Sequence, residues 1–161
     1  IVQEYVGTAE DEFTVGVLQD LEGNYINSIA VKRLLSGQLN IRSSVQNRSG
    51  RSELGDRLII SSGVSQGYVA SFPEVTEQCV EIARALKATG SINIQCRLVD
   101  GIVRIFEINP RFSGTTSLRA MMGYNEPDVL LQQYLLSTKT ESGFSYREGL
   151  VLRGLTEYII E

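Results

Sequence analysis

The chain lacks histidine altogether, and it contains only two cysteines among its 161 residues. The absence of histidine excludes Ser-His-Asp and Cys-His catalysis, and it excludes zinc sites built on imidazole. Cys79 and Cys96 lie on different predicted elements, so they cannot form a metal site alone. We interpret them as small buried apolar residues in a reducing compartment, which predicts a cytoplasmic protein.

Long apolar runs and an excess of basic residues are missing as well. Hydrophobic residues make up 42% and charged residues 21% of the chain, and the net charge is −4. No apolar run approaches the roughly 18 residues of a membrane span, and no secretory signal pattern is present. A net negative charge also disfavours general nucleic-acid binding. We therefore expect a globular domain that binds neither membranes nor nucleic acids.

Hydrophobic periodicity predicts an α+β fold with a mostly antiparallel sheet and helices packed on one face. The predicted strands cover residues 1–6, 12–20, 25–35, 91–99, 102–110 and 151–160, with a short strand at the start of residues 58–67. The predicted helices cover residues 72–90 and 125–136. Residues 36–57 are rich in Ser, Arg, Asn and Gly, which predicts a mobile loop with at most a short strand.

The hairpin around Asp100-Gly101 poses a question of register, because side chains alternate with period two. A two-residue loop would place Gln95 and Glu107 on opposite faces. A three-residue loop would pair Leu98 with Ile102 and bring Glu107 opposite Asn93, with Gln95 as its diagonal neighbour. We prefer the three-residue loop because it separates the apolar from the polar side chains. The polar face would then hold Asn93, Gln95, Arg97, Glu107 and Asn109, with Arg104 on the apolar face.

Glu107 stands inside an apolar run, where an unpaired carboxylate is costly to bury. Together with Gln95 and Asn109 it offers the oxygen ligands that Mg²⁺ prefers when phosphates complete its shell. A surface-facing polar sheet, with Glu107 paired to Arg97, is the structural alternative. Arg111 and the small hydroxyl-rich segment 113–117 that follow favour an anion near the cluster, although that segment also suits an ordinary helix cap.

Two longer motifs resemble a known family. The segment "NIQCRLVDGIVRIFEINPRFSG" is similar to the metal-binding hairpin of ATP-grasp enzymes, and "VQEYVGTAEDEFTVGVL" is similar to their interdomain linker and the strand after it. The resemblance is strongest to the ATP-binding domain of the carbamoyl-phosphate synthase large subunit and to related carboxylate–amine ligases. It implies that residues 1–161 are the C-terminal portion of an ATP-grasp domain, without its N-terminal portion. A chain that begins in a strand-like segment, with no initiator methionine, fits that expectation.

The resemblance also implies roles for particular residues. Glu107 would bridge two Mg²⁺ ions, for which Mn²⁺ could substitute. Gln95 and Asn109 would complete their shells, and Arg111 would contact the transferred phosphoryl group or the acyl phosphate. The remaining implied contacts are to the nucleotide: Gln3, Glu4, Tyr5 and Val6 to adenine, Glu12 to the ribose hydroxyls, and Lys32 to a phosphate.

The implied function is the Mg-ATP-binding part of a carbamoyl-phosphate synthase-like ligase that joins a small-molecule carboxylate to an amine through an acyl phosphate. The missing N-terminal part of the same protein would be a partner, homo-oligomerisation stays open, and the fragment alone would be inactive. Gly114 stands near the position where that synthase carries a second arginine, which argues against bicarbonate or carbamate as substrate. Two alternatives remain: a non-catalytic α+β binding or oligomerisation module, and another Mg-dependent phosphate-ester enzyme.

Overall fold

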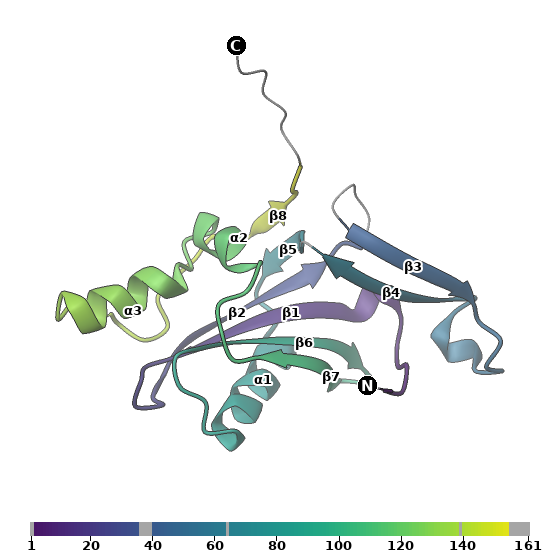
Figure 1. Ribbon diagram of the computed structural model, residues 1–161, viewed down its shortest axis with the longest axis horizontal. Coiled ribbons are helices and arrows are strands. Elements are labelled where there is room, and N and C mark those ends of the chain that lie inside the picture. Colours follow the sequence, from purple (N-terminus) through teal and green to yellow (C-terminus); the bar gives the residue numbers. More distant parts are fainter. Residues whose placement is uncertain (1, 36–39, 64, 139, 155–161) are drawn as a thin grey trace, which may run out of the picture.

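The computed structural model describes residues 2–35, 40–63, 65–138 and 140–154. A six-stranded sheet has the order β7-β6-β1-β2-β5-β8, and a separate two-stranded sheet pairs β3 with β4 (Figure 1). The strands are β1 (Glu12–Gln19), β2 (Tyr25–Arg33), β3 (Asn40–Gln46), β4 (Arg57–Gly63), β5 (Gly67–Ala70), β6 (Ser91–Val99), β7 (Ile102–Asn109) and β8 (Gly149–Val151). The helices are α1 (Pro73–Ala85), α2 (Thr116–Met121) and α3 (Glu126–Leu135), with 3-10 turns η1 (Ala9–Asp11) and η2 (Ser52–Leu54).

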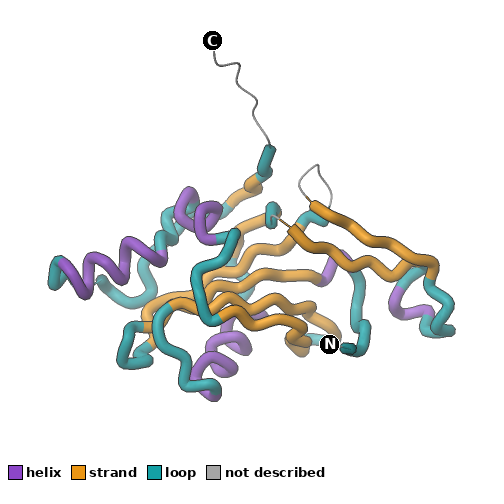
Figure 2. Tube along the Cα trace, in the orientation of Figure 1, coloured by secondary structure: helices purple, strands orange, loops and turns teal. Residues whose placement is uncertain are grey.

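Helix α1 covers one face of the large sheet (Figure 2). Phe13, Val15 and Val17 alternate along β1 and point to this face, where they are buried against α1. The helix contributes Val75 and Cys79, which its 3.6-residue period places on one stripe. This layer is the larger of the two apolar cores.

Helices α2 and α3 pack on the opposite face. Leu18 of β1 and Val31 of β2 are buried there against Leu118, Tyr124 and Val129. The prediction of an α+β fold with an antiparallel sheet is therefore confirmed, because each pair of neighbouring strands described in the large sheet is antiparallel. The expectation of helices on one face is corrected, because β1 is buried along its whole length and needs cover on both sides.

The β6–β7 hairpin differs from its expected register in an instructive way. Its turn has two residues, Asp100 and Gly101, with φ of 52° and 73°, so Val99 pairs with Ile102. The predicted three-residue loop is wrong. A bulge at Phe106 then shifts the pairing by one residue, so that Glu107 faces Gln95 rather than Asn93, its expected partner. The two-residue turn places Arg104 opposite Arg97, on the polar face rather than the apolar one.

Three further segments depart from expectation. Residues 2–6 form no strand, and the last strand covers only Gly149–Val151, with residues 155–161 outside the described part. Within the predicted loop 36–57, residues 36–39 also lie outside the described part. Asn40–Gln46 form a full strand that pairs with β4, so the loop interpretation is wrong there. The β3–β4 hairpin was hard to predict because apolar residues such as Val45 and Ile60 are exposed on it rather than buried.

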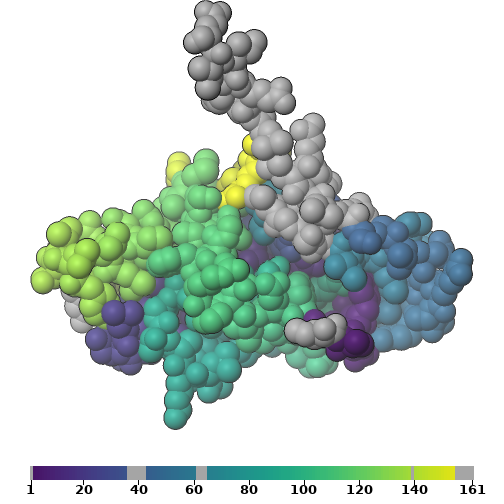
Figure 3. Space-filling view, in the orientation of Figure 1, coloured from purple at the N-terminus to yellow at the C-terminus, as the bar shows by residue number. Residues whose placement is uncertain are grey.

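The molecule is elongated, with α3 at one end and the β3–β4 hairpin at the other (Figure 3). Ala9, Leu35 and Ile59 form a small apolar cluster that joins this hairpin to the main body. Within the described ranges, no helix has the length and apolar character needed to span a lipid bilayer.

Candidate functional site

The face of β1 that α2 and α3 share changes character along the strand. At one end Leu18 belongs to the apolar core. Gly16 comes next and lies against a buried ion pair, and Thr14 then donates a hydrogen bond to Asn93 Oδ1 at 2.9 Å. At the far end Glu12 borders a cavity. Along this face of β1, the side chains thus change from an apolar core residue at Leu18 to a cavity-lining carboxylate at Glu12.

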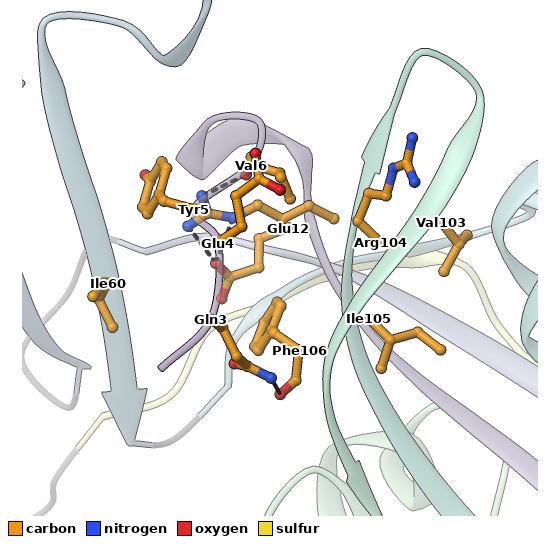
Figure 4. A pocket seen from close by; sticks show the side chains of 11 residues that line it. Gln3, Glu4, Tyr5, Val6, Glu12, Ile60, Val103, Arg104, Ile105 and Phe106 are labelled. Atoms are coloured by element: carbon orange, nitrogen blue, oxygen red, sulfur yellow. Dashed lines mark hydrogen bonds and ion pairs between the residues drawn. The ribbon is translucent and has the colours of Figure 1, made fainter. Parts of the chain in front are cut away.

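The cavity has a volume of about 630 Å³ and lies between the N-terminal segment, β4 and the β6–β7 hairpin (Figure 4). It is lined by Gln3, Glu4, Tyr5, Val6, Glu12, Ile60, Arg97, Val103, Arg104, Ile105 and Phe106. The five residues predicted to contact adenine and ribose therefore share one cavity. Gln3 Nε2 donates to the Phe106 carbonyl at 3.0 Å, which fastens the N-terminal segment to the bulge of β7.

Glu12 is held by two arginines. Its Oε1 accepts from Arg33 Nη1 at 2.6 Å, and its Oε2 accepts from Arg97 Nη2 at 3.0 Å. All three side chains are at most 6% exposed. Burial lowers the pKa of the Arg33 guanidinium below its usual value, while the charges of Glu12 and Glu107 oppose that shift. Removing one partner of a buried ion pair of this kind strongly destabilises the folded protein.

Arg97 also organises the walls of the cavity. It donates from Nη1 to the Val6 carbonyl at 3.0 Å and from Nη2 to the Ile59 carbonyl at 2.8 Å. Its guanidinium lies 4.5 Å from the centroid of the Tyr5 ring. The Tyr5 hydroxyl in turn accepts from the Ile59 backbone N–H at 2.8 Å. One arginine therefore ties the N-terminal segment and β4 to the large sheet.

The three predicted metal ligands form a single hydrogen-bonded cluster. Gln95 Nε2 donates to Glu107 Oε2 at 2.7 Å, and Asn109 Nδ2 donates to Glu107 Oε1 at 2.6 Å. Arg111 Nη2 reaches Asn109 Oδ1 at 3.4 Å. The alternative in which Glu107 pairs with Arg97 is not what the structure shows, because Arg97 pairs with Glu12.

The donor set of this cluster decides what kind of metal it could hold. Among the described residues, no group of three or more His, Cys, Asp or Glu side chains could bind a metal. The cluster instead offers one carboxylate and two carboxamide oxygens. Mg²⁺ commonly accepts one or two protein carboxylates when phosphates and waters fill its other positions. The residues therefore fit a cation that is shared with a phosphate ligand.

Lys32 lies outside this group. It pairs with Phe13, so it points to the face that α1 covers, and its Nζ lies 5.9 Å from the Phe13 ring centroid. Its neighbour Arg33 points to the polar face and makes the contact to Glu12. Sequence reasoning missed Arg33 and Phe106. The alternation of the predicted return strand was the signal for Arg33, whereas the bulge that turns Phe106 toward the cavity left no sequence signal.

A second polar cluster lies farther along the same face and is closed. Arg119 Nη1 donates to Glu126 Oε1 at 3.1 Å, and neither side chain is exposed at all. Ser91 and Thr116 donate to the two oxygens of Glu126, each at 3.0 Å. A Cβ on Gly16 would lie 2.6 Å from Arg119 Nη1, so this strand position requires glycine. The cluster anchors α2, and with it the segment after Arg111.

Comparison with known protein families matches residues 1–157 to a family described as "ATP-grasp in the biosynthetic pathway with Ter operon". The chain belongs to the ATP-grasp family. The match covers almost the whole chain, including the N-terminal segment, β1 and the β6–β7 hairpin that form the site.

Two solved structures of D-alanine–D-alanine ligase from Bacillus anthracis, one of them complexed with ATP, are also similar to this ATP-grasp chain. Each is 14% identical, with TM-scores of 0.37 and 0.38, and the match covers 78% of this chain and 40% of the ligase. The chain thus spans about two fifths of the length of those ligases. Likeness at this level carries no argument about substrates.

Proposed function

We propose that this ATP-grasp chain forms the Mg-ATP-binding part of an ATP-dependent carboxylate–amine ligase that works through an acyl phosphate. One observation carries the proposal: the cavity lined by residues 3–6 ends at Phe106, and the next residue, Glu107, is the centre of the oxygen cluster. A nucleotide could therefore place its base in the cavity and its phosphates at the cluster. The site would be completed by an N-terminal portion of the same protein.

The cavity would hold the adenine between the N-terminal segment and the apolar side chains of Phe106 and Ile60. Most ligand pockets combine such apolar walls with a few fixed polar groups. Glu12 would accept the ribose hydroxyls. Its oxygens already accept one hydrogen bond from Arg33 and two from Arg97, so a ribose hydroxyl would share or replace one of these contacts.

The chemistry would rest on charge rather than on a protein base. Mg²⁺, when bound, supplies neutralisation of the phosphate charges. Gln95, Glu107 and Asn109 would hold it. Arg111 would place a fixed positive charge where negative charge develops on the transferred group, which is the main demand of phosphoryl transfer. An amine then displaces the phosphate of the acyl phosphate, and no histidine is required.

The likeness to carbamoyl-phosphate synthase is the finer part of the proposal. It rests on the arrangement of Gln95, Glu107, Asn109 and Arg111, which the structure brings together. Gly114 has open space around it and no arginine takes its place. We therefore favour an organic carboxylate over bicarbonate as the group that is activated.

Calorimetric titration of ADP in the presence of Mn²⁺ tests the proposal, with the complete protein and its Glu107→Gln variant. Loss of the only carboxylate in the cluster should weaken Mn-ADP binding at least about tenfold. Glu77→Gln, the same change on the exposed side of α1, is the matched control and should have no effect.

Two outcomes would contradict the proposal. Equal binding of Mn-ADP and Mn-pyrophosphate would favour another Mg-dependent phosphate-ester enzyme, because the cavity would then have no role. No binding of Mn-ADP at all would favour a non-catalytic module whose polar face is merely solvated.

A further inference from the structure

Arg33 lies between Glu12 at the cavity and Gln95 in the oxygen cluster. Its Nη1 donates to Glu12 Oε1 at 2.6 Å and reaches Gln95 Oε1 at 3.4 Å. Gln95 continues the path to Glu107. A chain of polar contacts therefore runs from the cavity to the oxygen cluster through one buried cation.

The orientation of the Gln95 amide follows from this chain. A guanidinium can only donate hydrogen bonds and an ionised carboxylate can only accept them. Gln95 must therefore turn its oxygen toward Arg33 and its NH₂ group toward Glu107, as the structure shows. In this orientation, a cation that approaches Glu107 meets the amide hydrogens of Gln95 rather than its oxygen.

Arg33 is not held equally at both ends. Its bond to Glu12 is short and joins two charges, whereas its contact with Gln95 is long and joins a charge to a neutral amide. Its Nε has no hydrogen-bond partner among the described residues, although it is buried. The contact to Gln95 is therefore the weaker of the two, and it is the one that a guanidinium following Glu12 would give up first.

We propose that Arg33 is a positioning residue that couples the cavity to the oxygen cluster, so that ribose at Glu12 releases Gln95 to bind a divalent cation with Glu107. The proposal rests on the proposed function, because it takes Glu12 as the ribose contact. This coupling predicts an effect that direct contact between phosphate and metal does not predict. A nucleoside without phosphates should raise the affinity of the protein for the metal.

Adenosine is the probe that isolates this coupling, since it has base and ribose but no group to ligate the metal. Mn²⁺ affinity is measured by electron paramagnetic resonance on the complete protein, with and without saturating adenosine. We expect adenosine to tighten Mn²⁺ binding about fivefold, the lower end of common coupling factors, and Mn²⁺ to tighten adenosine binding equally. 2′,3′-Dideoxyadenosine, which lacks the 2′ and 3′ hydroxyls of the ribose, should leave Mn²⁺ affinity unchanged.

Arg33→Gln should remove the coupling and also raise the affinity for Mn²⁺ alone severalfold, because a positive charge near Glu107 is removed and Gln95 is released. A purely structural role predicts the reverse, a weaker metal site. Arg33→Lys keeps the charge beside Glu12 but has no fork to bridge both groups, so it should lose the coupling with little loss of stability. Arg84→Gln, an exposed arginine on α1, is the matched control.

The outcomes distinguish failure of the coupling from failure of the proposed function. Wild-type protein that binds Mn-ADP but shows no adenosine effect on Mn²⁺ overturns the coupling and leaves the proposed function standing. The same holds if both Arg33 variants keep the effect. Failure of wild-type protein to bind Mn-ADP overturns the proposed function itself.

Discussion

Two polar clusters on one face of the sheet each contain charged side chains, and they differ in what surrounds those charges. Arg119 and Glu126 form a closed cluster, in which buried hydroxyl groups complete the ion pair and neither charged side chain is exposed. Glu12 and Glu107 belong to an open cluster, in which Glu12 borders a cavity and Glu107 is an exposed carboxylate that accepts from two amides. The closed cluster uses its charges to fix α2 against β1. The open cluster lies where the proposed function places the nucleotide and its cation.

The largest expected effect is the loss of the closed pair. Glu126→Gln leaves the Arg119 charge buried without a counter-charge, and we expect a loss of about 3–5 kcal/mol in the free energy of unfolding. Urea denaturation measures it. Glu81→Gln removes the partner of Arg84 in an exposed pair and should change stability by less than about 1 kcal/mol. Equal losses of stability in the two variants would show that the closed cluster contributes no more to stability than an exposed ion pair.

The next effect concerns the space beside β1. Gly16→Ala would place a methyl group 2.6 Å from Arg119 Nη1 and 2.7 Å from Glu126 Oε1, so the ion pair must shift. We expect a loss of about 1–3 kcal/mol by the same denaturation assay, the usual result of overpacking. Gly114→Ala, beside the open cluster, meets no atom within 4 Å and should be nearly neutral. A neutral Gly16→Ala would contradict the close approach.

Alkaline pH should weaken the core next to the closed cluster. Burial, with the nearby Glu126 charge, raises the pKa of Tyr124 well above its ordinary 10.0. The folded protein then holds a proton that the unfolded chain releases above pH 10, so stability falls as pH rises from there. The slope from one such group approaches about 1.4 kcal/mol per pH unit. Tyr124→Phe should show a shallower decline between pH 10 and 11, and an unchanged decline would refute this role.

The smallest effect is expected in the open cluster. Glu107 is exposed, and its bonds to Gln95 and Asn109 can be replaced by water. Glu107→Gln should therefore alter the free energy of unfolding by no more than about 0.5 kcal/mol, while it weakens Mn-ADP binding. A large loss of stability in this variant would place Glu107 with the closed cluster and erase the contrast.

Much of this arrangement could be predicted from the residues themselves. The alternation of β1 and the carboxylate inside the apolar run of β7 indicated which face is polar, and they brought Gln95, Glu107 and Asn109 together correctly. The face was predicted correctly, but the register was not. Glu107 was expected opposite Asn93, whereas a two-residue turn and a bulge at Phe106 place it opposite Gln95. A longer turn and a bulge each add one residue, so either one puts Gln95 and Glu107 on the same face.

Other features could not be predicted because their causes lie far apart in the chain. Arg119 is fully buried although it follows a polar segment, since Glu126 and Asn93 meet it only when α2 folds onto the sheet. Gly16 inside a strand was a signal of close approach, but it did not say to what. Likewise Arg33 and Arg97 became partners of Glu12 only through the pairing of β1 with its two neighbours.

The sequence by itself indicated most strands of the large sheet, helices α1 and α3, and the residues of the oxygen cluster, because these depend on local periodicity and spacing. Tertiary structure alone decided which carboxylate is sealed and which stays open. That choice depends on what covers each end of one sheet face: helix α2 closes one end, whereas the N-terminal segment, β4 and the β6–β7 hairpin line a cavity at the other. Burial of a charge is a property of the assembled neighbours, and no short stretch of sequence contains them.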